Sequence, residues 1–140
     1  DPAWQASALT AMGRSADERW DDEVTRSLVH VDDRIRKAAV EAAGELSLQS
    51  ARPILLKMLG EEEDSSILSA VIWSLSQIGG EDVRTYLENL LDVVEDDDEQ
   101  IAFLEEALDN LAFTEDLERF DLLAFDRDDE LTELDEDEDK

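Results

Sequence analysis

The sequence predicts an all-α protein, and more specifically an α-solenoid of antiparallel helix pairs. Apolar residues recur every three or four positions along most of the chain, which is the spacing of one helix face. The same pattern returns at an offset of about 32 residues, as expected for a repeat architecture. No run of alternating apolar and polar residues is bounded by Asn-Gly or Asp-Gly, so no β-hairpin is indicated.

The repeat defines the units of the fold. Asp32 aligns with Asp64 and Ile35 aligns with Ile67, while Trp4 aligns with Ile35 at an offset one residue shorter. A single helix pair has too little apolar area to be stable alone, so each pair buries its face against the next. We expect a helical region over residues 1–113, with units of about 1–31, 32–63, 64–97 and 98–113.

Residues at the expected helix ends support these units. Asp32 and Asp64 each precede an apolar periodic run, where a carboxylate can accept hydrogen bonds from free backbone N–H groups. Gly79-Gly80 follows a periodic run and can adopt the left-handed conformation that ends a helix. Pro53 falls in a predicted first turn, where its missing N–H costs nothing.

Small and aromatic side chains indicate how the helices pack. Ala39 and Ala43 are expected to lie against neighbouring helices. Trp4 and Trp20 align with core-type positions, so we expect both in the core. Trp73 lies off the apolar stripe of its helix. We expect it to be exposed, where it would be a candidate anchor in a protein interface.

Composition excludes several classes of function. The 140 residues include 40 acids and 12 Lys or Arg, for a net charge of -28, with no Cys and one His. Without Cys there is no disulfide, thiolate metal site or cysteine nucleophile. A polyanion of this density repels nucleic acid, and no apolar run is long enough to span a membrane. We expect no catalytic residues, no cofactor, no metal and a cytoplasmic location.

Two patterns resemble chemical sites but favour simpler interpretations. His30 lies near Ser27, yet no triad partner is visible, so we interpret it as a residue at a helix C-terminus. Asp126, Asp128 and Glu130 have the spacing of a calcium loop. Leu131 occupies the next position, where that loop needs Gly, so no metal site is predicted.

The run from Asp32 to Leu46, with Asp32, Arg36 and the small residues up to Gly44, resembles a HEAT repeat of the short, bacterial, phycocyanobilin-lyase-like type. The resemblance covers about residues 2–111 and implies a stacked helical solenoid. It also implies that Asp32 and Arg36 tie neighbouring units through a carboxylate–guanidinium contact. Leu68 and Ala102 occupy the Arg position in later units, so the contact does not continue there.

Positive charges on the second helices form two predicted columns. Arg52 and Arg84 share one column with Asp21, and Arg26, Lys57 and Asn89 form the other. A basic strip in an acidic chain would attract an acidic partner peptide or the protein's own acidic tail. The alternative is ordinary surface charge paired along helices.

The C-terminal part is the most acidic. Residues 1–84 hold 16 acids and nine bases, whereas residues 85–140 hold 24 acids and three bases. We expect residues 114–125 to dock on the last helices and cap the solenoid, using an apolar cluster. Residues 126–140 are expected to be mobile or to lie against the Arg52/Arg84 strip. The competing interpretation is a recognition motif for another protein. The cluster comprises Leu117, Phe120, Leu122, Leu123 and Phe125.

The function that these observations favour is a non-catalytic scaffold for protein–protein interaction, present as a fragment of a longer protein. Its partner would be another protein or an acidic peptide segment. One alternative, implied by the resemblance, is an accessory protein that binds a tetrapyrrole as phycobilin lyases do. Another is a structural end-cap of a larger solenoid. The sequence leaves the oligomeric state open.

Overall fold

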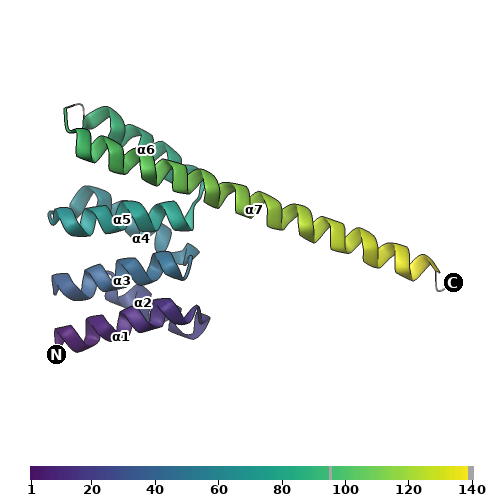
Figure 1. Cartoon of the computed structure of the whole chain (residues 1–140). Helices are drawn as coiled ribbons and strands as arrows, with labels where there is room; N and C mark the ends of the chain where they lie inside the picture. Colours follow the sequence, from purple (N-terminus) through teal and green to yellow (C-terminus); the bar gives the residue numbers. More distant parts are fainter. Residues whose placement is uncertain (95, 139–140) are drawn as a thin grey trace.

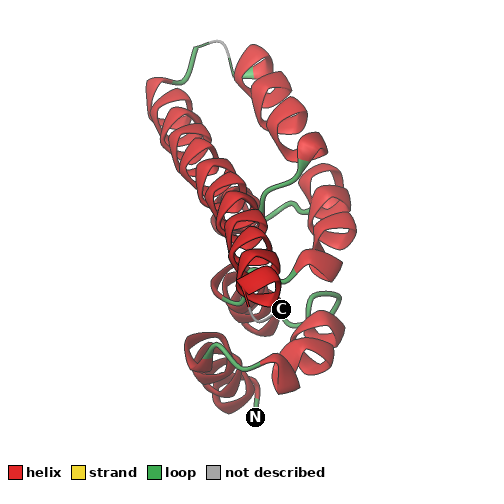
Figure 2. Ribbon diagram, turned by 90° about the vertical axis from the view of Figure 1, so that its right-hand side faces the viewer, coloured by secondary structure: helices red, strands yellow, loops and turns green. Residues whose placement is uncertain are grey.

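The computed structural model describes the backbone of residues 1–94 and 96–138, and the side chains of residues 1–94 and 96–123. Within these ranges the chain forms helices and loops and no strand, which confirms the predicted all-α class (Figure 2). The seven α-helices are α1 (Pro2–Ser15), α2 (Asp21–Ser27), α3 (Asp33–Glu45), α4 (Arg52–Glu61), α5 (Ser65–Ile78), α6 (Glu81–Val93) and α7 (Asp98–Glu138).

The helices stack in two rows (Figure 1). In one row α1 packs on α3, α3 on α5, and α5 on the first part of α7. The second row contains α2, α4 and α6, and each of these packs on the first helix of the following unit: α2 on α3, α4 on α5 and α6 on α7. Each repeat is therefore stabilised mainly by its neighbours, as expected for a solenoid.

Helix boundaries follow local chemistry. The side chain of Asp32 accepts a hydrogen bond from the N–H of Arg34, and that of Asp64 accepts from Ser66 and Ile67. These contacts satisfy N–H groups that have no partner in the first turn of a helix. Gly79 and Gly80 have φ angles of 76° and 124°, so the chain can turn between α5 and α6 without side-chain strain.

Glycines set the spacing between helices of the first row. A Cβ added at Gly13 would lie 2.8 Å from the Cα of Ala42, and one added at Gly44 would lie 2.9 Å from the Cα of Ser74. Both distances are too short for carbon atoms, so α1, α3 and α5 approach as closely as their backbones allow. Where α7 meets α5, polar contacts replace this close packing. Asn110 donates a hydrogen bond to the Ser76 hydroxyl, at 2.9 Å.

The core runs continuously through the stack. Ala39 and Ala43 are fully buried, which confirms that they pack against neighbouring helices. Large aliphatic side chains fill the space between the two rows, and the last of them belong to α7. Among those that are almost completely buried are Leu28, Ile35, Leu55, Ile67, Leu75, Leu87 and Leu111.

Trp4 is not in the core, contrary to the sequence-based expectation, because its side chain is 73% exposed. It aligns with Ile35, which is buried. The two helices have different neighbours in the described structure, since α3 packs against α1, α2 and α5, whereas α1 packs mainly against α3. Trp20 is half-buried and packs against the core.

The segment 114–125 contacts the stack at its start, through Thr114 and Glu115, but it does not dock back on the solenoid as expected. It continues α7 away from the stacked helices (Figure 1). The side chains of Leu117, Phe120, Leu122 and Leu123 are exposed. Residues 81–140 contain no Gly or Pro, so nothing in the sequence ends the helix there. The open face of α5 and α6 is covered instead by the first part of α7, with Leu104, Ala107 and Leu111 buried.

The predicted acidic tail, residues 126–140, continues α7 as far as Glu138. Its side chains, that of Phe125 and residues 139–140 lie outside the described part of the structure. The expectation that this tail is mobile or lies on the Arg52/Arg84 strip therefore stays a prediction.

Candidate functional site

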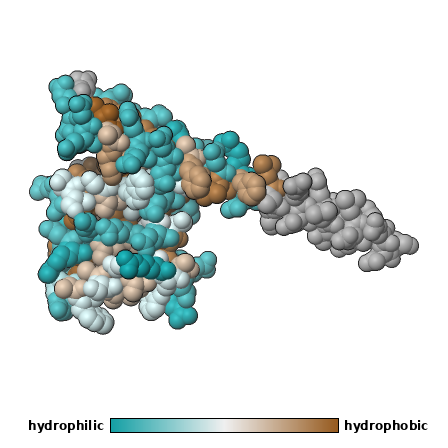
Figure 3. Space-filling model, viewed as in Figure 1, coloured by the Kyte–Doolittle hydropathy of each residue, from teal (hydrophilic) through white to brown (hydrophobic). Residues whose placement is uncertain are grey.

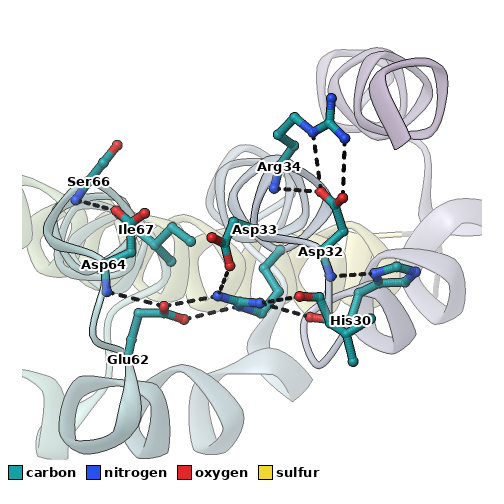
Figure 4. Close-up of polar contacts among 10 residues, drawn as sticks. His30, Asp32, Asp33, Arg34, Glu62, Asp64, Ser66 and Ile67 are labelled. Atoms are coloured by element: carbon teal, nitrogen blue, oxygen red, sulfur yellow. Dashed lines mark hydrogen bonds and ion pairs between the residues drawn. The ribbon is translucent and has the colours of Figure 1, made fainter. Parts of the chain in front are cut away.

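An ion-pair cluster around Arg36 joins two of the loops between units (Figure 4). Its guanidinium donates to both carboxylate oxygens of Glu62, at 3.1 and 3.0 Å, and to Asp33 at 2.6 Å. A further N–H group donates to the carbonyls of His30 and Val31, both at 3.1 Å. Arg36 thus ties the α2–α3 loop to the α4–α5 loop, and it is largely shielded from solvent.

The predicted contact between Arg36 and Asp32 is wrong, because the carboxylate that faces Arg36 across the two units belongs to Glu62. Asp32 caps α3 and pairs with Arg34 at 3.3 Å, while Arg36 pairs with Glu62, which lies 26 residues further along the chain. Asp32 points to the start of its own helix, so Glu62 at the end of α4 takes the place facing Arg36. The tie between units that the resemblance implied is present, but Glu62 supplies its carboxylate.

These contacts favour the charged forms of Asp32 and Arg36. Hydrogen bonds from the Arg34 side chain hold the pKa of Asp32 below its ordinary value of 3.8. Hydrogen bonds to Glu62 raise the pKa of Arg36 above its ordinary value, so this guanidinium stays charged. Arg36 is therefore a fixed positive charge that ties the two loops together.

His30 serves the loop between α2 and α3. Its Nδ1 accepts a hydrogen bond from the N–H of Asp32 at 3.0 Å, and the side chain is exposed. It lies beyond the end of α2 rather than in its last turn, so its local role is to fix the loop. Among the described side chains, no group of three or more His, Asp or Glu is arranged to hold a metal ion.

The predicted basic strip is only partly available as a surface. The Arg52 side chain donates to the Gly79 carbonyl at 2.6 Å and also contacts Gln49. Arg84 pairs with Glu115 of α7 at 2.9 Å. These two residues therefore contribute contacts within the stack. The charge of Arg84 is paired with a carboxylate, whereas the described contacts of Arg52 are to neutral groups.

The other column of predicted binding residues is exposed. Arg26 pairs with Glu23 at 2.7 Å and Lys57 lies 3.9 Å from Glu61, each within its own helix. Asn89 is exposed on α6. These residues occupy equivalent positions on α2, α4 and α6, and short ion pairs of this kind contribute little stability. Trp73, on α5, is 37% exposed, as the sequence predicted.

An apolar groove, which the sequence did not predict, lies where α4, α5, α6 and α7 meet. Its volume is about 470 Å³. Half-buried large side chains come together there from positions that are far apart in the sequence. The apolar residues that line it include Leu59, Leu68, Ile72, Leu90, Val94 and Phe103.

A second apolar surface lies on α7 where this helix leaves the stack. Figure 3 shows apolar side chains gathered on this helix between the stacked helices and the grey segment. Phe113, Leu117 and Phe120 are spaced by four and three residues, so they lie on one side of the helix. Phe120 is 67% exposed and Leu117 is 49% exposed. We call residues 113–123 the α7 arm.

None of the helices in the described part of the chain has the length and apolar character needed to cross a membrane.

Comparison with known proteins agrees with the repeat seen in sequence and structure. The family model for HEAT repeats matches residues 1–68 and, in a second overlapping match, residues 26–109. A search of curated proteins gave no match. The family matches extend through the three helix pairs and into α7, over well more than half of the 140 residues. The chain therefore belongs to the HEAT-repeat family.

Proposed function

We propose that this chain is a non-catalytic scaffold for protein–protein interaction and that the α7 arm is one of its contact surfaces. HEAT repeats generally serve as scaffolds of this kind. The observation that carries the proposal is the row of Phe113, Leu117 and Phe120, whose side chains are exposed where α7 leaves the stacked helices. Exposed apolar rows of this size are typical of interaction sites.

Burial would make this row a strong anchor. Full burial of a large apolar side chain is worth about 1.5–3 kcal/mol, so the three side chains together provide enough energy for a specific contact. An amphipathic helix that presents residues at these spacings fits a complementary groove. Arg119 is the only base among residues 98–123, so the partner surface that fits the arm is basic around an apolar groove.

The test compares two variants of the full chain as bait. Leu117→Glu with Phe120→Glu removes the apolar row, and Ala102→Glu with Ala112→Glu adds the same charge at exposed positions elsewhere on α7. Some proteins will be retained by the parent and by the control variant, Ala102→Glu with Ala112→Glu, but lost with the arm variant. These proteins are then purified and titrated directly. We expect at least one to bind the parent and to lose about tenfold or more in affinity with the arm variant.

The proposal fails if no purified protein distinguishes the arm variant from its control. The tetrapyrrole alternative has its own test, an absorbance titration of the parent chain with a free bilin. Saturable spectral change at one equivalent would favour the pigment-binding function over the scaffold.

A further inference from the structure

The groove between α4, α5, α6 and α7 is a distinct surface from the α7 arm. Leu68 and Ile72 of α5, Leu90 of α6 and Phe103 of α7 all border it while only half-buried. Protein interiors are close-packed, so apolar side chains that surround an unfilled volume of about 470 Å³ lack contacts that an incoming apolar side chain would restore.

The charge around the groove is uniformly negative. Asp97 and Glu99 border it, and the acidic run Glu61–Asp64 leads into α5 beside it. None of the described residues that line the groove is basic. α4 and α6 also end here, and the C-terminal end of a helix carries partial negative charge that favours cations.

The N-terminal ends of α5 and α7, which also lie beside the groove, do not make its rim positive. Helix N-termini attract anions, but here both are already capped by carboxylates of the chain. Asp64 accepts hydrogen bonds from Ser66 and Ile67, and Asp97 accepts from Glu99 and Gln100 at 3.2 Å. The groove is thus apolar inside and acidic at its rim, so an anionic ligand is disfavoured and a cationic one is favoured.

We propose that this groove binds a basic peptide segment of a partner protein, with an apolar side chain seated between α5 and α7 and Lys or Arg residues against the acidic rim. A second copy of this chain does not fit, because its exposed apolar row lies on the acidic α7 arm and would be repelled. The inference rests on the proposed scaffold function and names the chemistry of one partner.

The test is a fluorescence titration of the full chain with a synthetic amphipathic peptide of Lys and Leu, at physiological ionic strength. A peptide with Ser in place of every Leu carries the same charge and serves as the peptide control. We expect saturable binding of the Lys/Leu peptide and at least about tenfold weaker binding of the Lys/Ser peptide. Equal binding of the two would show attraction by net charge alone and would overturn the proposal.

Protein variants locate the binding. Leu68→Lys places a positive charge in the groove, and Leu122→Lys makes the same change on the α7 arm. The first should weaken binding of the Lys/Leu peptide by about tenfold and the second by no more than about twofold. Equal effects of the two variants would overturn the groove assignment.

A second pair of variants tests the groove even if Leu68→Lys does not fold. Ser69 is exposed and borders the groove, whereas Ser66 is exposed on the same helix outside it. Ser69→Lys should weaken binding more than Ser66→Lys, and equal binding would again overturn the proposal. If no purified protein distinguishes the arm variant from its control while the Lys/Leu peptide still binds the groove, only the proposed arm contact fails, so the two proposals fail separately.

Discussion

The two halves of α7 have similar side chains but different surroundings. In the first half, Leu104, Ala107 and Leu111 are buried against α5 and α6, and the hydroxyl of Thr114 donates to the Ser76 carbonyl at 2.8 Å. Beyond Glu115, the described leucine and phenylalanine side chains, at residues 117–123, face solvent. The side chains of the first part are buried because other helices pack against it, whereas those of the arm are exposed because no described helix does.

This comparison shows how the stack ends. In the first row, α3 and α5 are each packed between two helices of adjacent units, whereas α7 covers the last unit and then extends beyond it. A helix without tertiary contacts depends on intrinsic propensity, which is marginal for short segments. The first half of α7 therefore has a structural role, and the second half is free to contact another protein.

The largest difference between the halves should appear on leucine truncation. Leu111→Ala removes a fully buried side chain and should lower the free energy of unfolding by about 3 kcal/mol, because it leaves a cavity. Leu122→Ala, in the same helix, should change it by less than about 0.5 kcal/mol, since the side chain is exposed. Urea denaturation measures both. Equal losses would mean that the arm is packed in solution.

Close helix packing inside the stack can be tested with a single methyl group. Gly13→Ala should destabilise the protein by about 1–3 kcal/mol, since its Cβ would meet the Ala42 backbone. Gly60→Ala, in α4, meets nothing within 4 Å and should stabilise the protein by up to about 1 kcal/mol. Thermal unfolding gives the sign of each change. The same sign for both variants would contradict the close approach of α1 and α3.

A smaller effect is expected at the tie between units. Glu62→Gln removes the charge that faces Arg36 and should lower stability by about 1–2 kcal/mol, because the guanidinium keeps its contacts with Asp33 and the two carbonyls. Glu63→Gln makes the same change at an exposed neighbouring position and serves as the control. A cost for Glu62→Gln no larger than that of its control would show that the Arg36 cluster does not stabilise the stack.

Local signals made much of the fold predictable. Asp32, Asp64 and Gly79-Gly80 mark helix ends by chemistry that acts within a few residues, and the structure has helices where they indicate. Trp4 was misplaced because alignment with Ile35 assumes the same neighbours, which the first helix lacks. The missing Gly and Pro after Gly80 were the signal for a continuous α7.

The candidate surfaces were harder to predict because they depend on contacts between distant residues. Arg36 meets Glu62 only after α3 and α4 have stacked, and Arg52 meets Gly79 only once α5 is in place. The groove brings Leu59 and Phe103 together from different units. Alignment of the repeats shows which residues occupy equivalent positions. It does not show which of these residues are paired with another residue of the same chain.

Amide hydrogen exchange along α7 tests the central claim most directly. If packing against α5 and α6 holds the first half and nothing holds the second, amides of residues 101–114 should exchange much more slowly than those of residues 116–123. The drop in protection should fall close to Glu115, which among the described side chains is the last on α7 with an ion pair to α6. Uniform protection through residue 123 would contradict the account, because it would mean that the arm is held as firmly as the stack.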